Sequence, residues 1–417
     1  MSSVGPTRWT DPAMHRRVRR RYASERWFGA LGLAAVSLSV LFLAFLLTTM
    51  ASKGIGGFTQ FEARLPIDFV TSDLFLDPAT LRGPDAAQTV AGADLEGAIS
   101  KAATAAYGPA AADLFGDAAV RKLGDAIVAK PEMLTGRSSF WLPVASKIDI
   151  AAKEQSDEAS ERLVNALDQG DVLRRSFNTQ FLSASDSTDP SSVGVWGALK
   201  GTFLTILVTI LLAFPVGVLT AVYLEEFAPR NRWTDAIEVS INNLAAVPSI
   251  IFGLLGLAVF LNVMNLPRSA PLVGGMTLAL MTMPVIVIAG RNAIKTVPPS
   301  IRDAALGVGA SKMQVTFHHV LPLALPGILT GTIIGMARAL GETAPLLMIG
   351  MRAFVAAPPG GIAEPATVLP VQIFLWSDEV DRGFVEKTSA AIIDLLLFML
   401  VMNGLAIYLR NRFERRW

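Results

Sequence analysis

The chain has 417 residues, of which 52% are hydrophobic and 17% charged, with a mean hydropathy of +0.47. Soluble domains carry about 25% charged residues, so this composition argues against a soluble protein and indicates an integral membrane protein. The net charge of +1 gives no overall bias toward nucleic acid. Because the chain has no cysteine, a disulfide framework, a thiolate nucleophile and a cysteine-based metal site are excluded.

Six segments are long and apolar enough to cross a membrane, which takes about 20 residues. They are 27–50, 202–224, 244–263, 272–289, 323–349 and 389–409. The first has too long an apolar core for a signal peptide and no clear small-residue cleavage site, so we interpret it as an uncleaved anchor. The sequence therefore predicts an all-α polytopic membrane protein with six transmembrane helices.

The positions of arginine and lysine predict the orientation, because cytoplasmic segments are enriched in both. They precede the first segment, follow the last, and occupy two alternate connections: Arg8, Arg16, Arg17, Arg19, Arg20, Arg21, Arg26, Arg230, Arg232, Arg291, Lys295, Arg302, Lys312, Arg410, Arg412, Arg415 and Arg416. The short connection 265–271 has only Arg268. We expect both termini in the cytoplasm, with the chain in the lipid of a bacterial inner membrane.

A polar region, residues 51–193, separates the first two segments and is expected outside the cytoplasm. Stretches such as DLEGAISKAATAAYG predict helices, and short runs such as SSFWLPVASKIDI predict strands. A stretch rich in Ser and Asp, LSASDSTDPSSVG, reads as a linker back to the membrane. The chain is thus expected to divide into a basic N-terminus with its anchor (1–50), a periplasmic α+β domain (51–193) and a membrane domain (194–417).

The connection before the fifth segment reads PPSIRDAALGVGASKMQVTFHHVLP and is the most informative stretch. Ser300 followed by Asp303, and Ser311 followed by Gln314, are capping-box patterns that predict two short helices. Gly307 and Gly309 are expected to break the first of these helices. An alternative interpretation is an amphipathic helix pair that lies on the bilayer surface.

This connection resembles the EAA loop of ABC importer membrane subunits, whose pattern is E-A-A, three residues, G, nine residues, I, one residue, L-P. The matching positions are Asp303, Ala304, Ala305, Gly309, His319, Leu321 and Pro322. Asp303 replaces Glu and keeps its charge, whereas His319 replaces an apolar Ile, which we expect to weaken packing beneath the loop. The resemblance implies that this loop docks into a cleft on a cytoplasmic ATPase, with the alanines allowing close approach.

The chain itself has no G-x-x-x-x-G-K-[ST] loop, so ATP and Mg²⁺ are expected on a separate ATPase subunit and no cofactor on this chain. No nucleophile–base set is found, so no catalytic residue is predicted. His318 and His319 are adjacent and cannot share one helix face, which argues against a metal site.

Two opposite charges, Arg338 and Glu342, lie four residues apart inside the apolar segment 323–349. Charges at membrane depth are costly and usually mark a transport path or a partner helix. A guanidinium presents a planar fork that suits a tetrahedral oxyanion, and Glu342 would restrain it. The alternative is an ion pair that neutralises itself and only packs within the bundle.

Several stretches resemble the PstA-type permeases of phosphate ABC importers: RALGETAPLL, YLEEFAP at 223–229, AAVPSIIFGLLGLAVF at 245–260, and residues 277–287. The resemblance covers about residues 196–416. It implies a type I ABC importer permease core, with Arg338, Glu342 and Thr343 on the substrate path. It also implies three partners: a PstC-type permease, a PstB-type ATPase dimer and a PstS-type periplasmic phosphate-binding protein. Glu225 and Glu226 are interpreted as a solvated helix end.

Two other functions remain open at this stage. The same type of ABC importer could transport sulfate, molybdate or phosphonate, because substrate specificity depends on few residues. A membrane sensor or scaffold with 51–193 as its receptor is a further alternative, disfavoured because no kinase, cyclase or methyl-accepting region is found. A membrane enzyme is disfavoured by the lack of a catalytic set.

Overall fold

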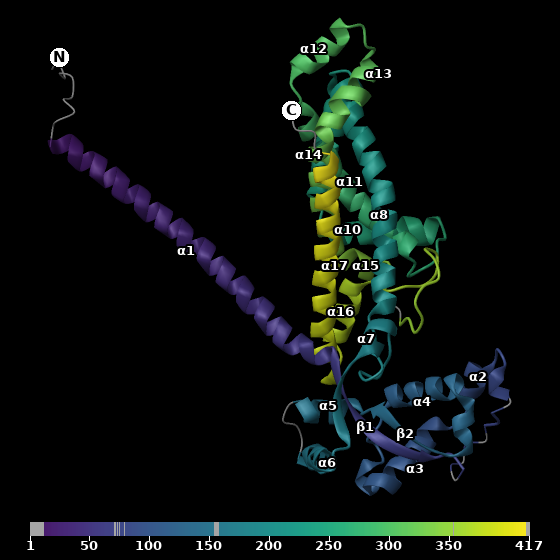
Figure 1. Cartoon of the computed structure of the whole chain (residues 1–417). Coiled ribbons are helices and arrows are strands. Elements are labelled where there is room, and N and C mark those ends of the chain that lie inside the picture. Colours follow the sequence, from purple (N-terminus) through teal and green to yellow (C-terminus); the bar gives the residue numbers. More distant parts are fainter. Residues whose placement is uncertain are drawn as a thin grey trace, which may run out of the picture. The chain divides into compact units, whose positions relative to one another are not determined.

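The computed structural model describes residues 12–413 apart from 71, 73, 75, 79, 154–157 and 353. Its contacts divide the chain into two units, Met1–Ser52 and Lys53–Trp417. The described part of the first unit belongs to helix α1 (Pro12–Gly57), which contains the predicted anchor segment (Figure 1). Arg8, Arg415 and Arg416, which entered the orientation argument, lie outside the described residues.

A three-stranded antiparallel sheet with strand order β2-β1-β3 organises the region that follows α1. Its strands are β1 (Thr59–Asp68), β2 (Arg137–Pro143) and β3 (Leu173–Phe177), and Ala63 of the central strand pairs with both Leu142 and Leu173. The helices of this sheet domain are α2 (Ala86–Ala91), α3 (Leu95–Tyr107), α4 (Asp117–Ala129), α5 (Ser146–Lys153), α6 (Glu158–Gln169) and α7 (Thr179–Ser183), with 3-10 turns η1 (Thr80–Arg82), η2 (Pro109–Ala111) and η3 (Pro131–Thr135).

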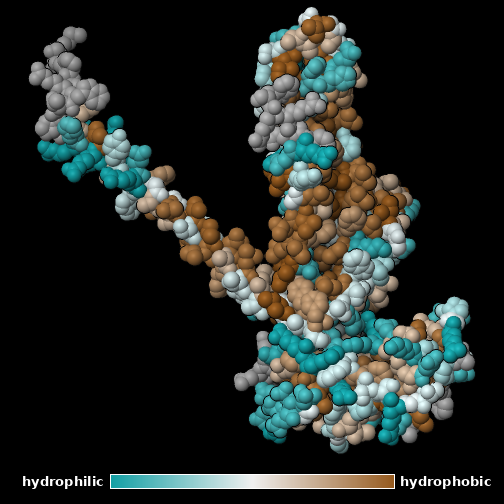
Figure 2. Space-filling view, viewed as in Figure 1, coloured by the Kyte–Doolittle hydropathy of each residue, from teal (hydrophilic) through white to brown (hydrophobic). Residues whose placement is uncertain are grey.

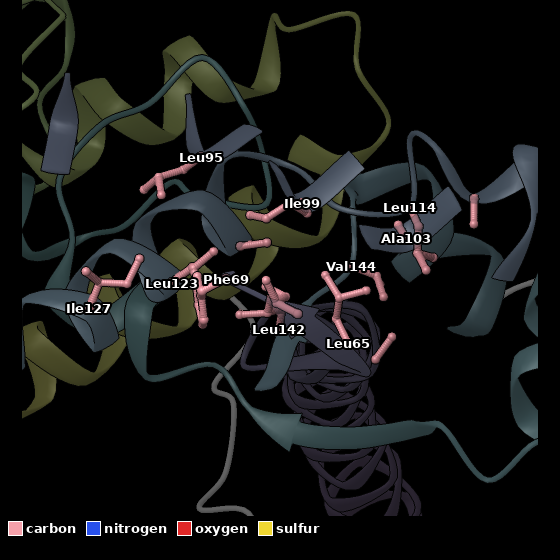
Figure 3. Packing of buried hydrophobic residues seen from close by; sticks show 14 of the residues in the cluster. Leu65, Phe69, Leu95, Ile99, Ala103, Leu114, Leu123, Ile127, Leu142 and Val144 are labelled. Atoms are coloured by element: carbon pink, nitrogen blue, oxygen red, sulfur yellow. The ribbon is translucent and has the colours of Figure 1, made fainter. Parts of the chain in front are cut away.

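The core of the sheet domain forms on one face of β1. Ala63, Leu65 and Ile67 are buried, as expected when successive side chains of a strand point to opposite faces. Leu123 and Ile127 of α4 belong to the same apolar cluster (Figure 3). This core holds the domain together without any disulfide, since the chain has no cysteine.

The segment interpreted as a linker is instead a packed part of the structure. Ser192 and Val193 are fully buried. Asp186 accepts hydrogen bonds from Gln372 Nε2 at 2.9 Å and from Trp376 Nε1 at 3.1 Å, which join it to α16 (Leu369–Ser377). The linker prediction is therefore wrong: the Ser and Asp side chains find partners inside the fold, which composition alone does not reveal.

Residues 196–413 form mainly helices. In chain order they are α8 (Trp196–Val222), η4 (Tyr223–Phe227), α9 (Arg232–Ala245), α10 (Ser249–Leu255), η5 (Gly256–Val263), α11 (Pro271–Lys295), α12 (Pro299–Gly307), α13 (Lys312–Val315), η6 (Thr316–Val320), α14 (Leu321–Leu340), α15 (Ala344–Met348), α16 and α17 (Gly383–Phe413). Here η4, η5 and η6 are π-helical turns. Figure 2 shows apolar side chains covering the long helices and polar ones covering the sheet domain.

Five helices of the described residues are long and apolar enough to cross a membrane, and a bent pair makes a sixth if it is counted as one span. The five include α1, α8, α11 and α17, together with the continuous run Lys312–Leu340. The predicted segment 244–263 is not one straight helix, because α9 and the run Ser249–Val263 meet at 104°. Pro248 explains the break, since proline cannot donate the backbone hydrogen bond that continues a helix.

Helices α8 and α11 pack closely through small residues. A Cβ atom built on Gly275 would lie 2.5 Å from Cβ of Val208 and 2.8 Å from the carbonyl oxygen of Thr205. Only glycine permits this approach, and small residues are the usual means by which membrane helices bring their backbones together. The tight contact fixes α8 against the first turns of α11.

Candidate functional site

The loop between α11 and α14 contains the two short helices that the sequence predicts. The second begins at a capping box: Gln314 N donates to Ser311 Oγ at 3.3 Å, and Ser311 N donates to Gln314 Oε1 at 2.9 Å. The first cap was predicted wrongly, because α12 is preceded by Pro298 and no side chain caps it. Pro299 already sets the backbone angle of the first turn, so helix initiation does not depend on Ser300.

The break between the two helices lies at Gly309. Its φ angle is +89°, a left-handed conformation that glycine adopts without strain. Its N–H donates to the carbonyl of Leu306 at 2.9 Å, and the next residue, Ala310, donates to Ala305 at 3.1 Å. These bonds satisfy carbonyls at the end of α12, which is the usual role of glycine after a helix.

The three residues that match E-A-A face in different directions. Asp303 and Ala304 are exposed, whereas Ala305 is 7% exposed and packs in the cluster that contains Val222, Val297 and others. The expectation that both alanines meet a partner is therefore wrong for Ala305. Adjacent residues of a helix point about 100° apart, so an E-A-A run cannot present all three side chains to one surface.

The expected effect of His319 is also wrong. His319 is exposed, and Val315 and Val320 fill the cluster beneath the loop instead. Leu321 and Pro322 lie in the first turn of α14 and are half-buried, so the L-P pair begins the helix as predicted. Within the described ranges, no group of three or more side chains is arranged to hold a metal ion.

The loop also exposes apolar side chains. Leu306 is 50% exposed, Val308 86% and Met313 60%. With Asp303 and Ala304 they make up what we call the loop surface: Asp303, Ala304, Leu306, Val308 and Met313. Exposed apolar side chains near an exposed carboxylate in one loop are typical of a site that another protein covers.

Glu225 and Glu226 are not a solvated helix end, which corrects their interpretation from sequence. Their side chains are 14% and 10% exposed. Glu225 accepts a hydrogen bond from Arg291 Nε at 2.5 Å, and Glu226 accepts from Arg302 Nε at 3.1 Å and Nη2 at 2.9 Å. Their partners lie 66 and 76 positions away in the chain, so no local sequence pattern identifies them.

Arg338 and Glu342 do not lie on one continuous helix. Helix α14 ends at Leu340, a short turn follows, and α15 begins at Ala344. The prediction of a helix that continues to residue 349 is therefore wrong, and a proline in the sequence explains where the helix ends. Pro345 has no N–H to donate to the carbonyl of Gly341, and it disfavours a helical conformation at the preceding residue. Thr343 lies in this turn and is half-buried.

Arg338 and Glu342 are only loosely paired. Nε of Arg338 lies 3.6 Å from Oε1 of Glu342, beyond hydrogen-bonding distance, and the two side chains are 48% and 23% exposed. Ile334, one turn earlier on α14, is 61% exposed. Within the described part of the second unit, this face of α14 is thus left open, and the guanidinium has room to contact a further group.

Two family models match different parts of the chain. Residues 213–416 match the family described as "Binding-protein-dependent transport system inner membrane component", and residues 15–162 match a domain of unknown function, DUF3333. The phosphate transport system permease protein PstA of Haemophilus influenzae is 32% identical over 226 residues, 54% of this chain and 77% of that protein.

PstA 1 of Mycobacterium tuberculosis is 36% identical over 156 residues, which cover 37% of this chain and 51% of that relative, so the chain spans about half of its length. Among solved structures, an inward-facing MetNI methionine ABC transporter matches with a TM-score of 0.41 and 19% identity. That match covers 53% of this chain and 95% of the transporter chain.

Proposed function

Because the chain belongs to the family of PstA-type phosphate transport system permease proteins, we propose that it is the transmembrane permease subunit of an ATP-driven importer of inorganic phosphate. It would form part of the translocation path and would couple to a separate ATPase through the loop between α11 and α14. The sheet domain would lie in the periplasm, and both termini would lie in the cytoplasm.

The loop surface is the observation that carries this proposal. Asp303 and Ala304 stand exposed beside Leu306, Val308 and Met313, while Ala305 anchors the helix on the chain's own core. An acidic residue with apolar neighbours suits a partner cleft that combines a basic side chain with apolar surface. A PstB-type ATPase dimer, which would bind ATP and Mg²⁺, is the partner we propose for it.

The open face of α14 supports a second partner. Arg338 and Ile334 lie on that face, and an exposed charge at this depth is costly unless a partner or a water-filled path covers it. We propose that a PstC-type permease covers this face. Arg338 would then line the shared path as a transient phosphate ligand, with Glu342 and Thr343 beside it, and a PstS-type binding protein would deliver phosphate from the periplasm.

Transport by the purified complex tests the function. The chain, its ATPase, a second permease and the binding protein are reconstituted in liposomes, and ATP-dependent uptake of labelled phosphate is measured. Competition by unlabelled phosphate, with little effect of sulfate, molybdate or phosphonate, would support the proposal. Stronger competition by one of the other anions would assign the importer to that anion, and ATP-independent behaviour would favour a sensor or scaffold.

A further inference from the structure

Three carboxylates and three cations tie together the chain segments next to the loop surface. Glu225 and Glu226 lie in η4 at the end of α8, Glu238 lies in α9, Arg291 and Lys295 lie in α11, and Arg302 lies in α12. We call these six residues the loop clamp. The ion pairs among these residues join four elements, η4, α9, α11 and α12. Figure 1 shows α12 close to one end of α14.

Arg302 is the central member of the loop clamp. Its Nε and Nη2 donate to Glu226, its Nη1 donates to the carbonyl of Val297 at 2.6 Å, and Nη2 also donates to the carbonyl of Ile294 at 3.0 Å. The last carbonyls of a helix have no partner within it, so Arg302 satisfies the end of α11 while holding η4. Asp303, the first residue of the loop surface, follows it directly.

Arg291 makes the second connection. Its Nε donates to Glu225, and its Nη2 lies 2.8 Å from Oε2 of Glu238, so one guanidinium joins η4 to α9. Lys295 adds a weaker contact to Glu225 at 3.4 Å. Adjacent helical residues point in different directions, so Glu225 reaches α11 and Glu226 reaches α12 from the same turn.

The Glu225–Arg291 and Glu226–Arg302 pairs are largely removed from water, with 12% of the Arg291 side chain and 23% of the Arg302 side chain exposed, whereas Glu238 and Lys295 are 40% and 54% exposed. Buried ion pairs add little net stability compared with apolar residues of similar size, but breaking one is costly. They also depend strongly on geometry, because a guanidinium offers several donors in a rigid plane. The loop clamp therefore holds η4, α9, α11 and α12 in fixed positions relative to one another.

We propose that Glu226 and Arg302 are positioning residues that make α12 move as one body with the ends of α8 and α11. An ATPase that displaces the loop surface would then displace these two helices with it. This inference rests on the proposed function, because it takes the loop surface as the ATPase contact. The clamp would be needed for transmission of the movement and not for docking.

The functional test uses Arg302→Gln, Arg302→Lys and Glu226→Gln in the reconstituted complex. Arg230→Gln is the matched control, since Arg230 is an exposed cation near the same turn. We expect the ATPase to remain bound and active, while phosphate transported per ATP falls by about tenfold, within the 5–150-fold range typical of coupling between sites. Arg302→Lys should retain only part of the coupling, because one amine cannot replace the fork.

A distance measurement tests the clamp independently of transport. Spin labels on Arg230→Cys and on Ser300→Cys, an exposed position of α12 outside the loop surface, report the separation of the loop from the end of α8 in a chain without other cysteines. With the clamp intact, the distance should stay narrow and unchanged between the nucleotide-free and ATP-bound complex. In Arg302→Gln it should broaden or shift. If Arg302→Gln prevents insertion of the protein into the membrane, the same distances are measured in Glu226→Gln instead.

Three results would overturn the inference: unchanged phosphate per ATP in all variants, loss of ATPase binding, or the same distance distribution with and without the clamp. A parent complex that hydrolyses ATP but takes up no phosphate would instead contradict the proposed function. The distance measurement would still decide the role of the clamp in that case.

Discussion

Lys153 and Glu386 lie 233 positions apart in the chain, and Nζ of Lys153 donates to Oε2 of Glu386 at 2.8 Å. The same ammonium lies 2.6 Å from Oδ2 of Asp149 and 2.8 Å from each of the carbonyl oxygens of Gly56 and Thr59, so four acceptors share its three N–H donors. The Lys153 side chain is only 7% exposed. One buried cation thus fastens the sheet domain to the first turn of α17.

We expect Lys153→Met to destabilise the protein strongly, because it removes the ammonium that binds both Glu386 and Asp149 and leaves these largely buried carboxylates without those bonds. Breaking a buried pair costs about 3–5 kcal/mol, so the thermal unfolding temperature in detergent should fall clearly. Arg162→Met is the control: its pair with Glu158 is 80% and 87% exposed, and such pairs contribute about 1 kcal/mol or less. Equal melting of the Lys153→Met protein and the parent would refute this role.

Glu62 should make the sheet domain sensitive to acid. Burial by itself raises the pKa of Glu62, but hydrogen bonds and charge from Lys122 and Arg174 outweigh it and hold the pKa below its ordinary value of 4.5. A lowered folded pKa contributes stability that is complete above the unfolded value. That stability is lost as the pH falls below 4.5 through the folded pKa.

Glu62→Gln should therefore lower the unfolding temperature at neutral pH, by the equivalent of about 1–3 kcal/mol. The difference from the parent should shrink progressively below pH 4.5. Thermal melts over this range measure it, with Glu158→Gln as an exposed control. A difference that does not depend on pH would show that the charge of Glu62 is not the cause.

Ala304 and Ala305 should respond differently to the same increase in size. Ala305→Phe overfills the apolar cluster, which typically costs about 1–3 kcal/mol, so it should lower stability. Ala304→Phe points outward and should leave the unfolding temperature unchanged while weakening ATPase association. Melting temperature and co-purification of the ATPase separate the two effects. Normal ATPase binding by Ala304→Phe would remove this residue from the docking surface.

Arg338 should be required for uptake of phosphate. Arg338→Lys keeps the charge but loses the planar fork, and loss of one charge-assisted hydrogen bond, about 1.5–3 kcal/mol, lowers uptake about tenfold or more. Arg338→Gln should abolish uptake, and Glu342→Gln should reduce it less. Uptake is compared at equal membrane levels. Near-normal uptake by the double variant Arg338→Gln/Glu342→Gln would mean that the pair only stabilises the helices.

The sheet domain and the loop surface should lie on opposite sides of the membrane. Cysteine placed at Ala129, an exposed position of α4, should react with an impermeant thiol reagent from the periplasmic side. Cysteine at Val308 should react only after the inner membrane is opened. The reverse pattern would overturn the orientation inferred from the arginine and lysine positions.

The sequence by itself determined the features that depend on neighbouring residues. Apolar segments, the capping box at Ser311 and the left-handed break at Gly309 involve groups within about four residues of one another, so their patterns are legible along the chain. Gly341 and Pro345 are local signals for the end of α14. The prediction missed them because the apolar run continues through residue 349.

Only the tertiary structure decided which residues meet. The partners of Glu225 and Glu226 lie 66 and 76 positions away, so no local pattern distinguishes their buried pairs from a solvated helix end. The burial of Ala305 and the open face around Arg338 depend on which helices pack together. Local hydrogen bonding shapes each helix, but the removal of side chains from water is settled by contacts between distant segments.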